Sequence, residues 1–333
     1  MDSMQFAQVI PRLRVLETRL LDKAKIDRMI DGDSANEALK VLQESEYANV
    51  MTGVKRAEDY EIVLSKELKR VYELMYDISP EKSLVDLMAI KYDYHNVKVL
   101  LKGIFLNKDV SDMLIPVGKI NLSFLKHSID NNNLSDLPSF MRSGIEKAKE
   151  VFEGTTDPQQ IDIILDNSMF EEMKEISKEL NDRFVDKYVS ALIDLTNLKT
   201  LLRVKKQNKA RDFLQQVIIN GGAIGEDTLV ALLNDAPENI SNKLTFTDYS
   251  EVIKSGLEDY IKTGSSSLLE KLIDNYIMDM MREAKFIPFG VEPLLAYIYA
   301  KETEIKVVRI IMVGKLNNIS GEVIRERLRD IYV

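Results

Sequence analysis

The sequence predicts an all-α protein, and three observations support this class. Apolar residues recur at helical spacing along most of the chain, for example at Val97, Leu100, Leu101, Ile104 and Phe105. Glycine and proline are scarce, at 14 and 8 of the 333 residues, whereas a β-rich protein needs both for its turns. No stretch alternates between polar and apolar residues as a half-buried strand would.

The expected helices begin at recognisable signals and are separated by short polar loops. In a capping box, a Ser or Asp is followed three residues later by Glu or Gln, and this pattern predicts helix starts at Ser34, Asp157, Ser168, Asp248 and Ser267. Proline suits a first helical turn, where its missing N–H is harmless, at Pro80, Pro158 and Pro293. Loops are expected at 31–33, 131–133, 154–158, 220–222, 264–267 and 288–290.

An internal repeat indicates how the helices are grouped. Residues 93–108 and 194–209 are identical at seven of 16 positions, at an offset of 101. A weaker third copy at an offset of 107 places Glu304 over Asn197. Helical units of this length are expected to stack side by side, and the predicted modules are 1–125, 126–233 and 234–333. The repeated Asn96 and Asn197 are poor helix formers, which indicates either a hydrogen bond between helices or a partner contact.

Few enzyme signatures survive inspection, and we expect no catalytic activity, cofactor or metal. The chain has no cysteine and two histidines, and neither Gly118-Lys119 nor Gly314-Lys315 completes a phosphate-binding loop. One acidic group, Glu171, Glu172 and Glu175, has the spacing to hold Mg²⁺ in an all-helical enzyme. Its alternative interpretation is a solvated helix start, where acidic residues favour the helix dipole.

The charge pattern points to protein partners. The net charge of −9 argues against nucleic acid. Five cations nevertheless fall within nine residues, and we take them as candidates for docking an acidic partner or anionic headgroups: Arg203, Lys205, Lys206, Lys209 and Arg211. They could instead complement the dipole at a helix C-terminus. We expect no signal peptide, since residues 1–6 show no basic region followed by an apolar run. We expect no membrane span, since the longest stretch without charged residues, 213–225, is too short.

Residues 286–306, FIPFGVEPLLAYIYAKETEIK, resemble a signature of the C subunit of A-type and V-type rotary ATPases, called the d subunit in the eukaryotic nomenclature. The similarity continues through 309–317 and 324–329, and residues 14–22 also resemble that family. It therefore spans the chain. In residues 288–292 we expect turn and capping chemistry at the entry to a long helix.

The resemblance implies a funnel of three pseudo-symmetric helical modules on the cytoplasmic face of a membrane rotor ring. The lower end of the central stalk would seat in its cavity, and the protein would carry torque between stalk and ring without being catalytic. The partners implied are the central-stalk subunits and the ring. The resemblance assigns no contact residues, so the five cations remain the docking candidates. The alternative function is a free α-helical repeat scaffold for cytosolic proteins, with a metal-dependent helical enzyme as a third class.

Overall fold

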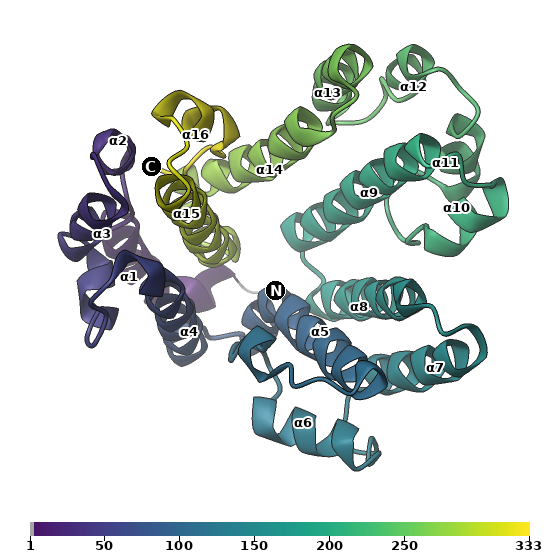
Figure 1. Ribbon diagram of the computed structural model, residues 1–333, viewed down its shortest axis with the longest axis horizontal. Helices are drawn as coiled ribbons and strands as arrows, with labels where there is room; N and C mark the ends of the chain where they lie inside the picture. Colours follow the sequence, from purple (N-terminus) through teal and green to yellow (C-terminus); the bar gives the residue numbers. More distant parts are fainter. Residues whose placement is uncertain (1–2) are drawn as a thin grey trace. The chain divides into compact units, whose positions relative to one another are not determined.

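The computed structural model describes residues 3–333, and there the chain forms sixteen α-helices, five short 3₁₀ helices and no strand (Figure 1). The predicted all-α class is confirmed. The α-helices are α1 (Val9–Glu17), α2 (Lys23–Asp31), α3 (Ala35–Gln43), α4 (Tyr60–Ile78), α5 (Lys82–Leu106), α6 (Leu122–Asp130), α7 (Ser139–Thr155), α8 (Pro158–Leu180), α9 (Arg183–Lys206), α10 (Arg211–Val217), α11 (Glu226–Leu232), α12 (Pro237–Lys243), α13 (Ser250–Thr263), α14 (Ser267–Arg282), α15 (Glu292–Leu316) and α16 (Gly321–Arg327). The 3₁₀ helices are η1 (Ser3–Phe6), η2 (Glu46–Val50), η3 (Ala57–Asp59), η4 (Ser111–Met113) and η5 (Glu283–Phe286).

The helices group into two compact units. The middle unit comprises residues 89–270, and the terminal unit comprises residues 3–88 together with 271–333. The division falls within α5 and α14. The three modules expected from the sequence, and their pseudo-threefold symmetry, stay a prediction. In the described part of the chain, no helix combines the length and the apolar character needed to cross a membrane.

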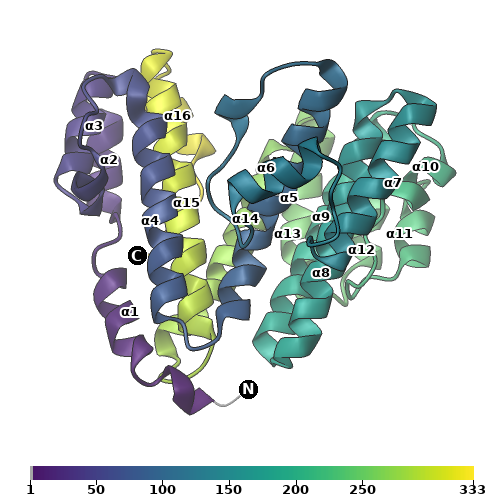
Figure 2. The same cartoon turned by 90° about the horizontal axis from the view of Figure 1, so that it is seen from below.

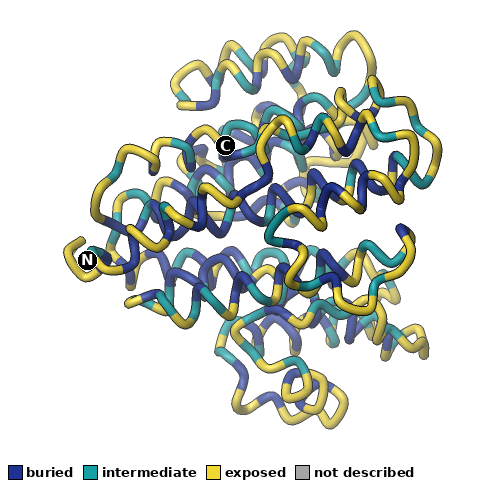
Figure 3. The backbone as a smooth tube through the Cα atoms, turned by 90° about the vertical axis from the view of Figure 1, so that its left-hand side faces the viewer, coloured by how far each residue is buried: buried dark blue, intermediate teal, exposed yellow. Residues whose placement is uncertain are grey.

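The terminal unit is built around α15. This helix packs against α1, α2, α3, α4 and α16, and Figure 2 shows α4 and α15 running side by side. Most of its residues between Pro293 and Gly314 are buried, and they are distributed around nearly the whole circumference of the helix. A helix that is apolar all round belongs in a core, whereas a one-sided stripe belongs at a surface. Figure 3 shows both kinds of helix, coloured by burial.

The two ends of the chain interlock within the terminal unit. The backbone N–H of Leu21 donates to the buried carboxylate of Glu304 over 2.5 Å. The hydroxyl of Tyr332 donates to Glu17 over 3.0 Å. The N-terminal segment and α15 therefore form one folded body, although more than 250 residues separate them in the sequence.

The middle unit contains a closely packed pair, α7 and α8. At their contact a Cβ added to Gly144 would lie 2.6 Å from the hydroxyl oxygen of Ser168, so glycine lets the two helices approach. Ser168 therefore lies inside α8, and the helix start predicted there is wrong. The helix expected to start at Asp248 begins two residues later, at Ser250, with Tyr249 at its N-cap. The predicted caps Ser34 and Asp157 are confirmed, since each side chain accepts a backbone N–H at a helix start.

The repeated asparagines of α5 and α9 make the same hydrogen bonds. Asn96 donates to the carbonyl of Ile115 over 2.8 Å and accepts from the N–H of the same residue over 2.8 Å. Asn197 forms the same pair with Ile219, over 2.7 and 2.9 Å. Both asparagines therefore form structural hydrogen bonds, but with loop backbone rather than with another helix. Ile115 lies between α5 and α6, and Ile219 lies between α10 and α11. We call this pair of bonds the Asn clasp.

One turn earlier in each helix, an aspartate binds the same loop. Asp93 accepts from the N–H groups of Lys119 and Ile120, over 2.9 and 3.2 Å. Asp194 accepts from those of Ala223 and Ile224, over 2.9 and 3.0 Å. A glycine precedes each pair of donors, and a Cβ on Gly118 or Gly222 would lie 2.1 or 2.0 Å from the carboxylate. The loop can approach the aspartate because no side chain intervenes.

The three longest helices, α5, α9 and α15, end in the same way. Each is followed by an asparagine with a positive φ, of 49° at Asn107, 51° at Asn208 and 54° at Asn318. The next N–H in each case binds a carbonyl five residues back, as in a Schellman motif. This shared ending aligns α15 with α9 at an offset of 110, so Glu304 matches Asp194 rather than Asn197. Like Asp194, Glu304 is buried and accepts a backbone N–H.

Candidate docking site

The five candidate cations lie around the C-terminal end of α9. Three occupy its last turn, one lies in the turn that follows, and one begins α10: Arg203, Lys205 and Lys206, then Lys209, then Arg211. They come together because Asn208 turns the chain sharply between the two helices. Cations at this position offset the partial negative charge of the helix C-terminus. The local structure therefore agrees with the helix-end interpretation of the cluster.

Two of the five cations are held by the protein itself. The ammonium group of Lys205 donates to the carbonyl of Leu233 over 2.5 Å, and that of Lys206 donates to the carbonyl of Gly264 over 2.9 Å. Both bonds connect the end of α9 to segments that follow it in the middle unit. These two lysines therefore have a structural task whether or not a partner binds.

The other three cations remain open to solvent. Arg203, Lys209 and Arg211 are exposed, and none forms an ion pair with any residue from 3 to 333. The ammonium group of Lys209 lies 5.6 Å from the centre of the Phe213 ring. We call these three residues the free cations. They give an acidic protein a local positive surface.

A groove of about 280 Å³ lies beside the free cations, and its lining residues come from α8, α9, α10 and the residue Ile219 after α10. Its lining is mixed, with eight polar and six apolar residues, and Arg203 and Thr200 line it from α9. The apolar lining comes from Ile163, Phe170, Val204, Phe213, Val217 and Ile219. This α9 groove could not be found from the sequence, because its walls come from separate segments and no local pattern brings them together.

The acidic side chains of the groove wall are already neutralised. Asp162 forms an ion pair of 2.6 Å with Lys102, and Asp166 forms one with Lys98. Both lysines belong to α5, which packs beside α8 within the middle unit. The uncompensated charge at the groove is therefore positive.

The acidic group considered for Mg²⁺ does not converge on one point. Glu172 is buried and accepts a hydrogen bond of 2.9 Å from the hydroxyl of Tyr94, whereas Glu175 pairs with Lys178. Within residues 3–333, no three His, Cys, Asp or Glu side chains are grouped to hold a metal ion. The ring of His95 is bonded to the carbonyl of Met113 over 3.0 Å. Glu172 and Glu175 therefore point to different partners instead of one shared point.

The loop before α15 exposes two aromatic rings. Phe286 is 86% exposed and Phe289 is 46% exposed. Arg14 fixes the loop by donating to the carbonyls of Ala284 and Ile287, over 2.7 and 2.9 Å. Gly290 has a φ of 140°, in agreement with the turn expected at 288–290. The exposure of the two rings could not be foreseen, because apolar residues in a sequence give no sign of which ones face solvent.

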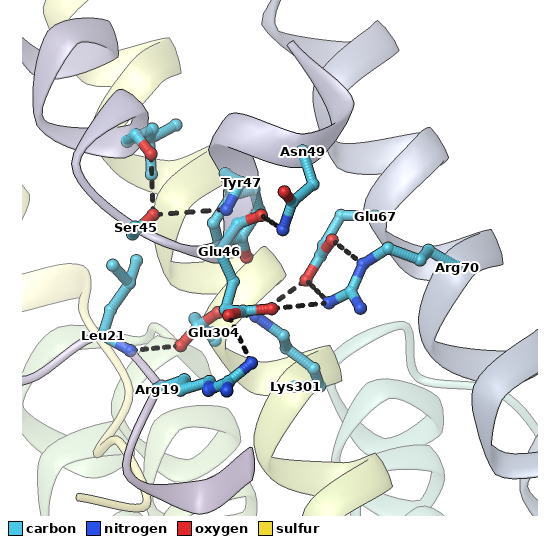
Figure 4. Close-up of polar contacts among 11 residues, drawn as sticks. Arg19, Leu21, Ser45, Glu46, Tyr47, Asn49, Glu67, Arg70, Lys301 and Glu304 are labelled. Carbon is cyan, nitrogen blue, oxygen red and sulfur yellow. Dashed lines mark hydrogen bonds and ion pairs between the residues drawn. The ribbon is translucent and has the colours of Figure 1, made fainter.

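A buried charge cluster lies in the terminal unit (Figure 4). The side chain of Lys301 is 1% exposed, and its ammonium group lies 2.9 Å from Glu67 and 2.6 Å from Glu304. Arg70 holds the other side of Glu67 through two hydrogen bonds of 2.8 Å. The ring of Tyr47 covers the ammonium group at 4.6 Å. The cluster joins α4, α15 and η2, and its only sequence signal was a Lys and a Glu three residues apart in a largely apolar segment.

The members of this cluster stabilise one another's charges. Burial lowers the pKa of Lys301, but the carboxylates of Glu304 and Glu67 raise it by more, so the net shift is upward. Burial raises the pKa of Glu67, but Arg70 and Lys301 outweigh it and the net shift is downward. Both groups are therefore charged at neutral pH. Burial also raises the pKa of Tyr47, which stays neutral.

The comparisons with known proteins give one consistent result. The sequence matches the model of the ATP synthase (C/AC39) subunit over residues 9–327. It is 31% identical over 331 residues to the C subunit of the V-type sodium ATPase of Enterococcus hirae, covering 99% of both chains. It is 27% identical over 347 residues to the C subunit of the A-type ATP synthase of Methanocaldococcus jannaschii, covering 98% of this chain and 87% of the relative. The corresponding protein of Pyrococcus abyssi is 25% identical over 342 residues, covering 96% of this chain and 89% of the relative.

These matches define the class as an all-helical subunit of V-type and A-type rotary ATPases. The chain belongs to the ATP synthase (C/AC39) subunit family. The resemblance found in residues 286–306 is confirmed.

Proposed function

We propose that this chain is the central-rotor subunit that couples the central stalk of a rotary ATPase to the membrane rotor ring and carries torque between them. The observation that supports this most is the end-to-end similarity to the C subunit of a V-type sodium ATPase, over 99% of both chains. In this proposal the chain catalyses no reaction. ATP hydrolysis or synthesis and ion transport take place in other subunits.

The mechanical task matches the construction of the chain. Torque is transmitted well by a body that deforms little, and close-packed interiors have low compressibility. The helices α5, α9 and α15 have 25, 24 and 25 residues, and each ends in the same fixed turn. The charge cluster and the clasps tie further segments to these helices.

The proposed location is the cytoplasmic face of the membrane, where the chain is held by its partners rather than by a span of its own. The free cations are the proposed docking site for acidic loops of a stalk or ring subunit. Their charge is uncompensated within residues 3–333 and stands out against the net charge of −9. Opposite charges steer such partners together and fix how they are oriented.

A reconstitution tests the proposal. Purified chain is mixed with tagged central-stalk subunits, or with a detergent-solubilised rotor ring, at low salt. We expect a 1:1 complex with the stalk subunits, capture by the ring, and no ATP hydrolysis by the chain alone. If the chain binds neither partner, the rotor assignment is wrong, and the free helical repeat scaffold becomes the better explanation.

A further inference from the structure

We propose that the α9 groove receives a large apolar side chain from an acidic segment of the partner protein, while Arg203 and Lys209 at its rim bind carboxylates of the same segment. This inference rests on the proposed function, because it names the chemistry of the partner that the free cations dock. It adds a specific apolar contact to what would otherwise be attraction between charges.

The shape of the groove supports an apolar occupant. Phe170 and Val204 are buried, and Ile163 and Phe213 are partly buried and line the groove. Three separate helices contribute to this surface, so a side chain entering it would be enclosed on several sides. In a binding pocket, apolar lining residues receive an apolar group and polar groups beside them fix its orientation. The six apolar residues of the groove, with Arg203 beside them, provide both.

The charges at the groove select an acidic segment over a basic or neutral one. Asp162 and Asp166 are already paired with lysines of α5, so they offer little attraction to an incoming cation. Arg203 lines the groove and forms no ion pair within residues 3–333. A guanidinium group binds a carboxylate through two parallel hydrogen bonds, which fixes the carboxylate next to the groove.

Lys209 and Phe213 connect the rim to the interior of the groove. The ammonium group lies 5.6 Å from the centre of the ring, and the ring itself lines the groove. A carboxylate bound at Lys209 would therefore lie close to the ring of Phe213, which belongs to the apolar part of the lining. An acidic residue close in sequence to a Leu, Ile, Met or Phe meets this arrangement.

A single photo-crosslinker identifies the occupant. The chain contains no cysteine, so Thr200→Cys provides one unique attachment point on the groove wall. The variant is labelled with benzophenone maleimide, assembled with stalk subunits and ring, irradiated and digested for mass spectrometry. We expect the crosslink to fall on an acidic partner segment next to a large apolar residue. A crosslink to a basic segment, or none at all in an intact complex, would overturn the inference and leave the rotor assignment standing.

A second variant measures the apolar contact. Thr200→Trp fills the groove and leaves every free cation in place. We expect its affinity for the stalk or ring proteins to fall by about ten- to hundredfold, as for the loss of one buried large apolar side chain. The loss should persist at high salt, because apolar burial is not screened. Ile104→Trp, at an exposed position near the end of α5, is the matched control and should change the affinity by less than about twofold.

The remaining outcomes separate the explanations. Equal losses in both tryptophan variants would indicate a general surface effect and overturn the inference. Binding to phosphatidylglycerol vesicles that Thr200→Trp abolishes would indicate a lipid headgroup site and also overturn it. If the unmodified chain assembles with neither stalk nor ring, the proposed function itself fails, which the crosslinking result alone would not indicate.

Discussion

Lys301 connects segments of the terminal unit, and the stability of that unit depends strongly on its charge partners. It is 1% exposed, and its charge is acceptable only because Glu67 and Glu304 lie against it. Removing one partner from a buried ion pair leaves an uncompensated charge, which costs far more than the pair itself contributes. The residue is therefore a sensitive position for stability.

We expect Lys301→Met to lower the free energy of unfolding by about 3–5 kcal/mol, because the buried carboxylate of Glu304 loses its cation and that of Glu67 keeps only Arg70. Urea denaturation followed by circular dichroism measures this loss. Lys306→Met is the matched control, since Lys306 pairs with Asp274 while nearly half exposed, and it should cost less than about 1 kcal/mol. Similar losses in the two variants would contradict the role assigned to the buried cluster.

Glu67 makes the stability depend on pH. Its folded pKa is lowered, so its contribution is present above the pKa of the unfolded chain, near 4.3 for an ordinary Glu, and is lost as the pH falls through the folded pKa. We expect the difference in unfolding free energy between the natural chain and Glu67→Gln to be largest near neutral pH and to shrink in acid. Urea titrations between about pH 3 and 7 measure it. A difference that grows on acidification would show that the shift has the opposite sign.

Substitution of the free cations should affect partner binding rather than folding. We expect the triple reversal of Arg203, Lys209 and Arg211 to Glu to weaken partner binding strongly at low salt and less at high salt, with unfolding nearly unchanged. Binding assays at two salt concentrations test this. The control reverses three exposed lysines elsewhere in the middle unit, Lys147, Lys254 and Lys262. If the control weakens binding equally, only net charge matters and the docking site is wrongly assigned.

At the scale of elements, the Asn clasp should stabilise α5 and α9 to a similar degree. We expect Asn197→Ala to lose about 2–4 kcal/mol, because two buried backbone groups of Ile219 lose their partner, and Asn96→Ala to lose a similar amount. Asn49→Ala, at an exposed site, should cost less than about 0.5 kcal/mol. Denaturation curves compare the three variants. An unaffected Asn197→Ala protein would show that the clasp contributes nothing to stability.

The helices could be predicted from the sequence much better than their contacts. Periodicity and caps such as Ser34 and Asp157 are local signals, so the all-α class and several helix starts were accessible. Ser168 misled the same rule, because a serine followed by a glutamate also occurs where a small side chain packs against Gly144. Only one partner of each clasp could be predicted from the sequence. The repeated Asp and Asn stood out, but their partners are backbone groups, which leave no trace in the sequence.

The candidate site was predictable in the same partial way. Five cations in nine residues form a local pattern, so the cluster itself was found. Which of them are tied to carbonyls depends on Leu233 and Gly264, and the groove depends on α8 and α10, all of which approach only in the folded chain. Tertiary proximity of this kind cannot be obtained from the spacing of one segment.

At the scale of the whole molecule, the decisive measurement is how tightly ATP hydrolysis is coupled to ion transport. We expect a rotary ATPase assembled without this chain to hydrolyse ATP without driving ion transport, and the purified chain to restore transport when added back. Measuring ion uptake into vesicles together with phosphate release gives the number of ions transported per ATP hydrolysed. Full coupling in a complex lacking the chain would contradict its role as a torque-carrying connection. The Lys306→Met variant, which leaves the charge cluster intact, should restore transport as well as the natural chain.

The way the chain's two ends share the terminal unit also determines the order in which it can fold during synthesis. Residues 3–88 leave the ribosome before the rest of the terminal unit. Leu21 can bond to Glu304, and Glu17 to Tyr332, only after residues 271–333 have been synthesised. Residues 89–270 are continuous and can fold while translation proceeds, since domains generally fold as units as they appear. The early segment must therefore remain incompletely packed, with apolar faces open to chaperones or to premature association, until α15 is released.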